Sequence, residues 1–266
     1  MSAVIWTTSL VPARPTFPVR SAPPLTLAGW LRHDRIRRLL TSCESVTSVL
    51  EIGAGEGALA VRLASVYDYT GVEPDMLAHR KAAQRLAALG RGKVILGDVA
   101  QVEPGLRFDL VCAFEVLEHI EADEDAVRDW CELLRPGGML LLTVPSGEHR
   151  FGAADARVGH YRRYETEGLR NMLEKAGFEI IKLDRYGFPL AYLLETLRHL
   201  IAARTERDVG PVDNTGGGGR WLQPPDALAW ATRLATVPFR AIDRVLPAWT
   251  PGTSLIALAR GPSSKS

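Results

Sequence analysis

The stretch Val49-Leu50-Glu51-Ile52-Gly53-Ala54-Gly55-Glu56-Gly57 decides the fold of this chain. It reads as a short apolar strand that enters a glycine-rich turn, and the run from Ala58 to Ala64 favours a helix after it. Glycines at three alternate positions let the backbone approach a ligand where a Cβ atom would collide with it. The amides that open the following helix would face the same ligand. The stretch therefore predicts a strand–turn–helix cradle for a nucleotide-like molecule.

The glycine spacing and two nearby acids narrow the kind of ligand. The pattern is Gly-x-Gly-x-Gly, whereas the dinucleotide-binding pattern places its last glycine one residue later. Glu51 lies at the strand end, where a carboxylate suits a cationic ligand better than a diphosphate. The next predicted strand, Tyr69 to Glu73, ends in an acid 16 residues after Gly57. A carboxylate at that place can accept hydrogen bonds from both hydroxyls of a ribose.

Five segments in order resemble the motifs of the class I S-adenosylmethionine-dependent methyltransferases. They are E-I-G-A-G-E-G at 51–57, V-E-P-D at 72–75, G-D-V at 97–99, F-D-L-V-C-A-F-E-V-L-E-H-I at 108–120 and L-R-P-G-G-M-L-L-L-T-V-P at 134–145. The resemblance implies an α/β fold with a Rossmann-like, doubly wound sheet of seven strands, the last two forming an antiparallel pair. It also implies S-adenosyl-L-methionine as the cofactor.

The resemblance assigns the cofactor to ten residues: Glu51, Gly53, Ala54, Gly55, Gly57, Glu73, Pro74, Asp98, Val99 and Glu115. In the resembled family the position of Asp98 accepts from the exocyclic amine of adenine, and the next residue packs on the ring. An alternative for Asp98 is that it simply caps the turn after its strand. We favour the cofactor-binding role because the other motifs accompany it.

Composition bounds the class of protein. At 266 residues the chain has the length of one large α/β domain, and 32 lysines and arginines against 31 acids leave a net charge of +1. This balance gives no electrostatic case for a nucleic-acid partner. The three cysteines form no close pair, no apolar run reaches about 18 residues, and no signal-peptide layout opens the chain. We therefore expect a cytoplasmic protein without a transmembrane segment, with peripheral membrane contact left open and no indication of its oligomeric state.

The chain divides into an arm, a domain and an insertion. Residues 1–24 carry five prolines and no apolar period, which indicates an irregular N-terminal arm. Residues 25–261 are expected to form a single methyltransferase domain. Its sixth and seventh strands, Phe178 to Leu183 and Thr253 to Ala259, are separated by roughly 65 residues, far more than a hairpin loop. A helical insertion is therefore predicted at about 187–251.

The insertion has three parts. Residues 190–201 carry an apolar stripe, 205–225 read as a mobile polar linker, and 226–246 as two short amphipathic helices. The favoured interpretation is a helical lid that closes its stripe over the open end of the sheet. The alternatives are an apolar substrate tunnel or a segment that contacts a membrane surface. We favour the membrane contact least because the flanking sequence is not strongly basic.

Other elements follow from apolar spacing and end signals. Leu27 to Leu40 predicts a helix, and Asp75 is expected to cap the helix 75–89. Pro136-Gly137-Gly138 is expected to end a helix before the fifth strand, Met139 to Val144.

The segment Gly159-His160-Tyr161-Arg162-Arg163-Tyr164 is the candidate for acceptor chemistry. It resembles the G-H-x-R-R-Y segment of bacterial methyltransferases that modify small molecules, lipids or sugars. Methyl transfer needs a base only when the acceptor must lose a proton, and a histidine suits that role near neutral pH. His160 is the catalytic hypothesis, with acceptor contacts assigned to His119, Tyr161, Arg162 and Arg163. A salt-bridge cluster at a helix start is the alternative for these residues.

The run Glu115-x-x-Glu118-His119 has two interpretations. If a helix begins there, the three side chains share one face and could hold a divalent cation. The run resembles the metal-binding motif of ubiquinone-pathway O-methyltransferases and that of small-RNA ribose methyltransferases, whose distal histidine His160 would match. Metal-free relatives share the run, and there Glu115 meets the methionine end of the cofactor through its backbone. We favour the metal-free interpretation.

The leading functional hypothesis is S-adenosylmethionine-dependent O-methylation of a small, partly apolar acceptor. Carbon or nitrogen methylation is the alternative within the same reaction class. A nicotinamide oxidoreductase shares the acid after the second strand, but the glycine spacing speaks against it. A third alternative is a cofactor-binding protein without transfer activity.

Overall fold

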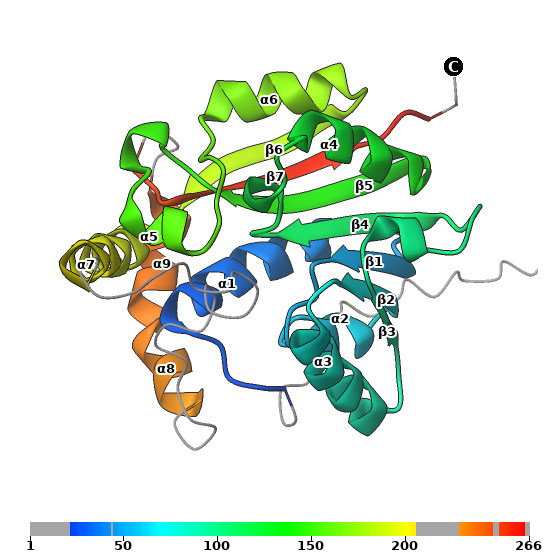
Figure 1. The fold of residues 1–266 in the computed structure, drawn as a ribbon, viewed down its shortest axis with the longest axis horizontal. Helices are drawn as coiled ribbons and strands as arrows, with labels where there is room; N and C mark the ends of the chain where they lie inside the picture. The colour runs from blue at the N-terminus through cyan, green and yellow to red at the C-terminus, as the bar shows by residue number, and fades with distance from the viewer. Residues whose placement is uncertain (1–21, 44, 206–228, 247–249, 264–266) are drawn as a thin grey trace, which may run out of the picture.

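A seven-stranded sheet forms the centre of the computed structural model, which describes residues 22–43, 45–205, 229–246 and 250–263. The strands lie in the order β3-β2-β1-β4-β5-β7-β6 (Figure 1). They are β1 (Ser48–Ile52), β2 (Asp68–Glu73), β3 (Lys93–Leu96), β4 (Phe108–Phe114), β5 (Leu134–Pro145), β6 (Glu179–Tyr186) and β7 (Ser254–Arg260). β7 is antiparallel to both β5 and β6, and the other pairs are parallel. The predicted fold class is confirmed.

Helices cover both faces of the sheet. One face carries α1 (Leu27–Ser42), α2 (Ala60–Ala64) and α3 (Met76–Leu89), and the other carries α4 (Asp123–Glu132) and α6 (Thr166–Lys175) (Figure 1). Each face has its own apolar core: Ile36 and Leu86 belong to the first, Trp130 and Leu169 to the second. β1 is buried along its whole length, as expected of a central strand covered on both faces.

Local signals predicted most element ends. Asp75 caps α3 by accepting from the Ala78 amide at 2.7 Å, as expected. The prediction for Pro136-Gly137-Gly138 was wrong in part: α4 ends earlier, at Glu132, and the three residues lie inside β5. The pairing of β4 with β5 shifts between Phe108 and Leu110, so this first part of β5 is an irregular strand.

The insertion contains α7 (Leu190–Thr205), α8 (Ala229–Ala235) and α9 (Val237–Val245). The short helix α5 (Ala153–Arg157) lies earlier in the chain, between β5 and α6. Residues 1–21 of the predicted arm, 206–225 of the predicted linker and 226–228 of the predicted helical stretch lie outside the described residues, whereas Thr205 belongs to α7. The expected lid differs from the structure in one respect. The α7 side chains Leu193, Leu197 and Ile201 are 63%, 48% and 40% exposed, so within the described chain the stripe does not close over the sheet.

The carboxyl ends of β1, β2, β3, β4 and β5 meet at one edge of the sheet because these strands are parallel. In an open α/β sheet this edge is where ligands bind. Every motif of the candidate site follows one of these strand ends.

Candidate cofactor and acceptor site

The glycine turn after β1 is tied to β2 and leaves space on one side. The amides of Gly53 and Ala54 both donate to the Val72 carbonyl at 3.0 Å. A Cβ atom at Gly55, whose φ is +55°, would have no protein atom within 4 Å. A Cβ atom at Gly57, whose φ is +81°, would lie 2.9 Å from Ala82 Cα of α3. Gly55 therefore faces open space, whereas the absence of a side chain at Gly57 lets the turn pack closely against α3.

Glu73 lies at the end of β2 with its carboxylate beside this turn. Its Oε2 accepts from the Gly55 amide at 2.6 Å and its Oε1 from the Asp75 amide at 2.9 Å. The side chain is buried, while Pro74 after it is exposed. A carboxylate has about four acceptor positions, so these two bonds orient the group and leave others for ribose hydroxyls.

Glu51 is a buried acid whose carboxylate accepts one hydrogen bond from a side chain. It is 2% exposed, and the Tyr69 hydroxyl donates to its Oε2 at 2.6 Å. Burial raises the pKa of Glu51 from its ordinary 4.5 to about 8, with a smaller contribution from the charge of Glu73. A bound cation would favour the charged form of this carboxylate, which fits the predicted cationic ligand.

Asp98 caps the turn that follows β3. Its Oδ1 accepts from the Ala100 amide at 2.8 Å, and its own amide donates to Gln101 Oε1 at 2.7 Å, in a capping box over the 3₁₀ turn Val99–Gln101. Asp98 is exposed, and Val99 packs against the apolar core. The structure thus contains the capping arrangement that was the alternative interpretation, and the adenine contact stays a prediction.

Glu115 ends β4 in a conformation that non-glycine residues rarely adopt. Its φ is +58°, its amide donates to the Thr143 carbonyl, and its Oε1 accepts from Thr143 Oγ1, both at 2.9 Å. The chain continues as the 3₁₀ turn Leu117–His119. The expectation that Glu115, Glu118 and His119 share one α-helical face was therefore wrong, because a strand end and a tighter turn separate them.

Glu118, His119 and His160 nevertheless meet in space. One ligand atom from each lies within 4.8 Å of the others, and the two imidazole rings meet edge to face with centroids 4.6 Å apart. Glu118 is fully buried, and within the described protein neither of its carboxylate oxygens has a hydrogen-bond partner. Burial, aided by the charge of Glu115, raises its pKa well above the ordinary value. Uncompensated polar atoms of this kind point to a ligand that completes the site.

Asp155 holds the other side of His160. The distance from its Oδ1 to His160 Nδ1 is 3.3 Å, and that from Glu118 Oε1 to His160 Nε2 is 3.8 Å. Desolvation would raise the pKa of Asp155, but His160 and Arg163 lower it far below its ordinary range. The imidazole therefore lies between a charged carboxylate and the buried Glu118.

The predicted acceptor residues have different surroundings. Arg163 is buried and binds Asp155 through two bonds of 2.9 and 2.8 Å and Glu195 of α7 through a third of 2.8 Å. Arg162 binds Asp123 at 2.9 Å, and Tyr161 is 54% exposed. The guanidinium of Arg163 is thus saturated by internal partners, so its role as an acceptor contact has no support in this geometry.

Sequence reasoning missed Arg32 of α1. Burial would lower the pKa of its guanidinium. Electrostatic interactions with Glu115, Tyr186 and Glu118 outweigh this effect and raise the pKa above its ordinary value. The Arg32 guanidinium also donates a hydrogen bond to the Tyr186 side chain. Arg32 therefore brings a positive charge to the two acids after β4. Only the tertiary structure reveals this, because Arg32 is one of four arginines between positions 32 and 38.

The fold and this site define a cofactor-binding α/β domain with a polar acceptor side, and comparison with known proteins gives its family. A model for the methyltransferase domain matches residues 28–183. The chain belongs to this family, within the class I S-adenosylmethionine-dependent methyltransferases, and S-adenosylmethionine is the cofactor of that class.

Individual relatives are distant and match only part of their length. A probable S-adenosylmethionine-dependent methyltransferase of Mycolicibacterium smegmatis is 30% identical over 157 residues, 57% of this chain and 60% of the relative. A ubiquinone biosynthesis O-methyltransferase of Methylobacterium nodulans is 30% identical over 153 residues, 50% of this chain and 60% of the relative. The match thus spans about 60% of the length of each.

The fold recurs in a solved structure with a bound product. The N-methyltransferase NodS from Bradyrhizobium japonicum, in complex with S-adenosyl-L-homocysteine, is 18% identical with a TM-score of 0.54. The likeness covers 95% of this chain and 94% of NodS. At this identity it shows the shared fold alone.

Proposed function

We propose that this chain transfers the methyl group of S-adenosylmethionine to an oxygen of a small, partly apolar acceptor, with His160 as the general base. The observation that carries the proposal is the position of His160 between Asp155 and the buried Glu118, which belongs to the turn after β4. The O-methyltransferase relative supports oxygen as the methylated atom, and nitrogen or carbon is the alternative.

The residues of the chain divide the work. Glu51, Gly55 and Glu73 would hold the cofactor, which supplies an electrophilic methyl group on a sulfonium when bound. The charged Asp155 favours the proton on Nδ1 of His160, so Nε2 is left as the acceptor for a substrate proton. The Asp155 carboxylate would stabilise the imidazolium that forms when that proton arrives, and Arg32 would offset the negative charge of Glu115.

A His160→Ala variant tests the base. Turnover is expected to fall by roughly 10²- to 10⁴-fold because the acceptor hydroxyl loses its proton acceptor. The cofactor dissociation constant, measured by isothermal titration calorimetry, is expected to stay within about twofold, since His160 does not line the glycine turn. His149→Ala, in a histidine that is 77% exposed, is the control and should keep full activity.

Mass spectrometry of products from an acceptor panel supplies the activity readout. Unchanged turnover in His160→Ala would remove the base assignment while leaving methyl transfer intact. Cofactor binding without a product from any acceptor would instead favour a binding protein without transfer activity.

A divalent cation is a second candidate because Glu118, His119 and His160 lie within 4.8 Å of one another. Two imidazoles and a carboxylate are ligands that Zn²⁺ and similar metals accept. A cation there would occupy His160 and lower the pKa of a bound acceptor hydroxyl instead. Chelator treatment separates the two: activity that survives it favours the base, and activity that returns only with added metal favours the cation.

A further inference from the structure

The helices α8 and α9 turn their apolar side chains to solvent. Thr236 alone separates the two helices, so they form one nearly continuous run. Five large apolar side chains on it are exposed, namely Trp230 (65%), Leu234 (59%), Val237 (47%), Ile242 (40%) and Val245 (81%). Their spacing of three to five residues places them along one side of the run. We call this set the outer stripe.

The opposite side of the same helices is polar and buried. Thr236 is 0% exposed and Asp243 is 3% exposed. Asp243 accepts from Arg35 Nε of α1 at 2.6 Å and from the Gly187 amide at 3.1 Å. A helix packed on a protein core shows the reverse polarity. Because buried polar bonds hold the inner side, the outward direction of the outer stripe is set by the fold.

The surface beside the outer stripe is cationic. On the described part of α8 and α9 the charged residues are Arg233, Arg240, Arg244 and the buried Asp243. Arg244 pairs with the buried Asp34 of α1 at 2.9 Å, so Arg233 and Arg240 supply the positive charge beside the stripe. This differs from the impression of weakly basic flanks that the sequence gives, because the one acid is turned inward.

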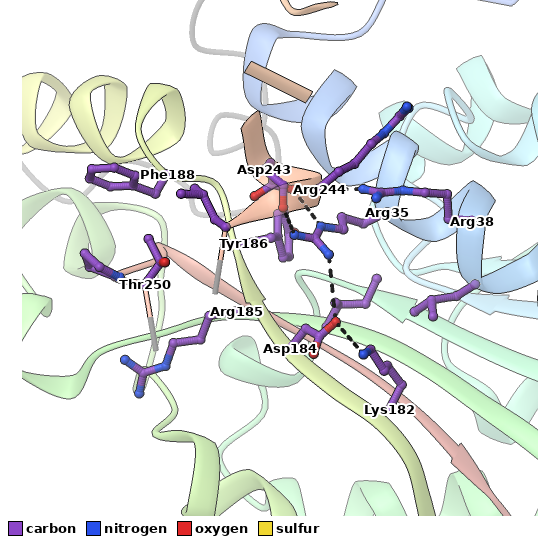
Figure 2. Close-up of a pocket in the computed structure, with 14 residues that line it drawn as sticks. Arg35, Arg38, Lys182, Asp184, Arg185, Tyr186, Phe188, Asp243, Arg244 and Thr250 are labelled. Atoms are coloured by element: carbon purple, nitrogen blue, oxygen red, sulfur yellow. Dashed lines mark hydrogen bonds and ion pairs between the residues drawn. The ribbon is translucent and has the colours of Figure 1, made fainter. Parts of the chain in front are cut away.

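A pocket of about 380 Å³ lies where α9 ends against α1 and β6 (Figure 2). Two carboxylates, Asp184 and Asp243, line it together with five cations: Arg35, Arg38, Lys182, Arg185 and Arg244. Arg244 belongs to this pocket and is followed directly by Val245 of the outer stripe. Each of these cations lies within 4.0 Å of a carboxylate, and counting the partners Asp34 and Glu165 leaves five cations against four acids. The apolar stripe therefore ends beside a hollow lined by ion pairs with a small excess of positive charge.

We propose that the outer stripe docks this protein on the surface of an anionic phospholipid bilayer. A helix with tryptophan and aliphatic residues on one side and arginines beside them lies in the interface between headgroups and acyl chains. Tryptophan prefers that depth, and arginines near the surface are attracted to anionic lipid. Among the described residues no helix is long and apolar enough to cross a membrane.

Vesicle co-sedimentation of the full chain tests the proposal. Binding is expected to vesicles of phosphatidylglycerol with phosphatidylcholine and to be much weaker to phosphatidylcholine alone. It should also weaken as NaCl rises from about 0.1 to 0.5 M, because salt screens the arginines. Ile242→Glu is expected to weaken binding roughly tenfold or more, because it places a charge in the stripe.

Ile181→Glu is the matched control. Ile181 lies on β6, away from the stripe, and is 42% exposed against 40% for Ile242. It should bind vesicles like the parent, and circular dichroism of both variants checks that they fold. Val245→Glu, at the most exposed position of the stripe, gives a second variant that does not disturb packing.

Three results would overturn the proposal. The first is that the parent protein fails to bind anionic vesicles. The second is that the Ile242→Glu and Ile181→Glu variants bind vesicles equally. The third is that sedimentation velocity shows a dimer that Ile242→Glu dissociates, while vesicles capture no protein. The last result would assign the stripe to a second copy of the chain. Vesicle binding needs neither cofactor nor acceptor, so its outcome is independent of methyl transfer.

Discussion

At the scale of single residues, Glu51 joins cofactor recognition to stability. Its folded-state pKa of about 8 lies above the ordinary 4.5, so the folded protein holds this proton more tightly than the unfolded chain. The resulting stabilisation is fully present below about pH 4.5 and is lost as the pH rises through about 8. The buried charge therefore destabilises the cofactor-free protein in alkaline solution.

Glu51→Gln should abolish this loss. Its amide oxygen can still accept from Tyr69, and it carries no charge to bury. We expect the variant to be more stable than the parent by a few kcal/mol at pH 8.5 and about equal at pH 4.5 in urea unfolding without cofactor. Cofactor affinity should fall, because the carboxylate that favours a cation is gone. A parent and a variant with parallel pH profiles would contradict the assignment.

His160 shows at the same scale how position decides role. Its neighbours Asp155 and Glu118 lie 5 and 42 residues away in sequence, and together they give the two ring nitrogens different surroundings.

Gly55 and Gly57 differ in the same way: both have positive φ, yet one faces open space and the other a helix backbone.

At the scale of elements, α9 is tied to α1 by ion pairs that include the buried Asp243. Asp243→Ala would leave Arg35 and the Gly187 amide without this partner. Removing one member of a buried pair costs about 3–5 kcal/mol, so we expect reduced stability and faster amide hydrogen exchange throughout α9.

Asp184→Ala is the control for that variant. Asp184 lies 3.8 Å from Arg35, but its side chain is 22% exposed, so its removal should cost less than about 1 kcal/mol. Equal losses in the two variants, or unchanged exchange in α9 of Asp243→Ala, would show that other contacts hold the helix.

At the scale of the whole molecule, the cofactor should stabilise the folded chain. A ligand present at 100 times its dissociation constant adds about 2.7 kcal/mol, which raises the midpoint of thermal unfolding by roughly 5–10 °C for a protein of this size. S-adenosylmethionine and S-adenosylhomocysteine should both produce this shift, and a nicotinamide dinucleotide should not. A shift with the dinucleotide alone would remove the assignment of the glycine turn.

Much of the fold was predictable because its signals are local. The glycine turn, the apolar strands and the Asp75 cap each depend on residues within one turn or strand. The long interval before the last strand likewise indicated an insertion. Pro136-Gly137-Gly138 misled the prediction because an irregular strand and a helix end share the same breaker residues.

The candidate site was only partly predictable. The motifs predict ten cofactor residues, and that assignment stays a prediction. The approach of Arg32 to Glu115 and Glu118 depends on how α1 packs over the sheet. The saturation of Arg163 by Asp155 and Glu195 likewise required α5 and α7 to be in place.

By itself the sequence determined the strands, the glycine turn and the class of cofactor, because periodicity and backbone freedom are properties of neighbouring residues. The tertiary structure alone decided which side of α8 and α9 faces outward and which acids lose their charge. The bond between Arg35 and Asp243, which lie 208 residues apart, sets the side of the helices that faces outward. Burial sets which acids lose their charge. Contacts at such separation leave no pattern in the local sequence, since each partner is surrounded along the chain by unrelated residues.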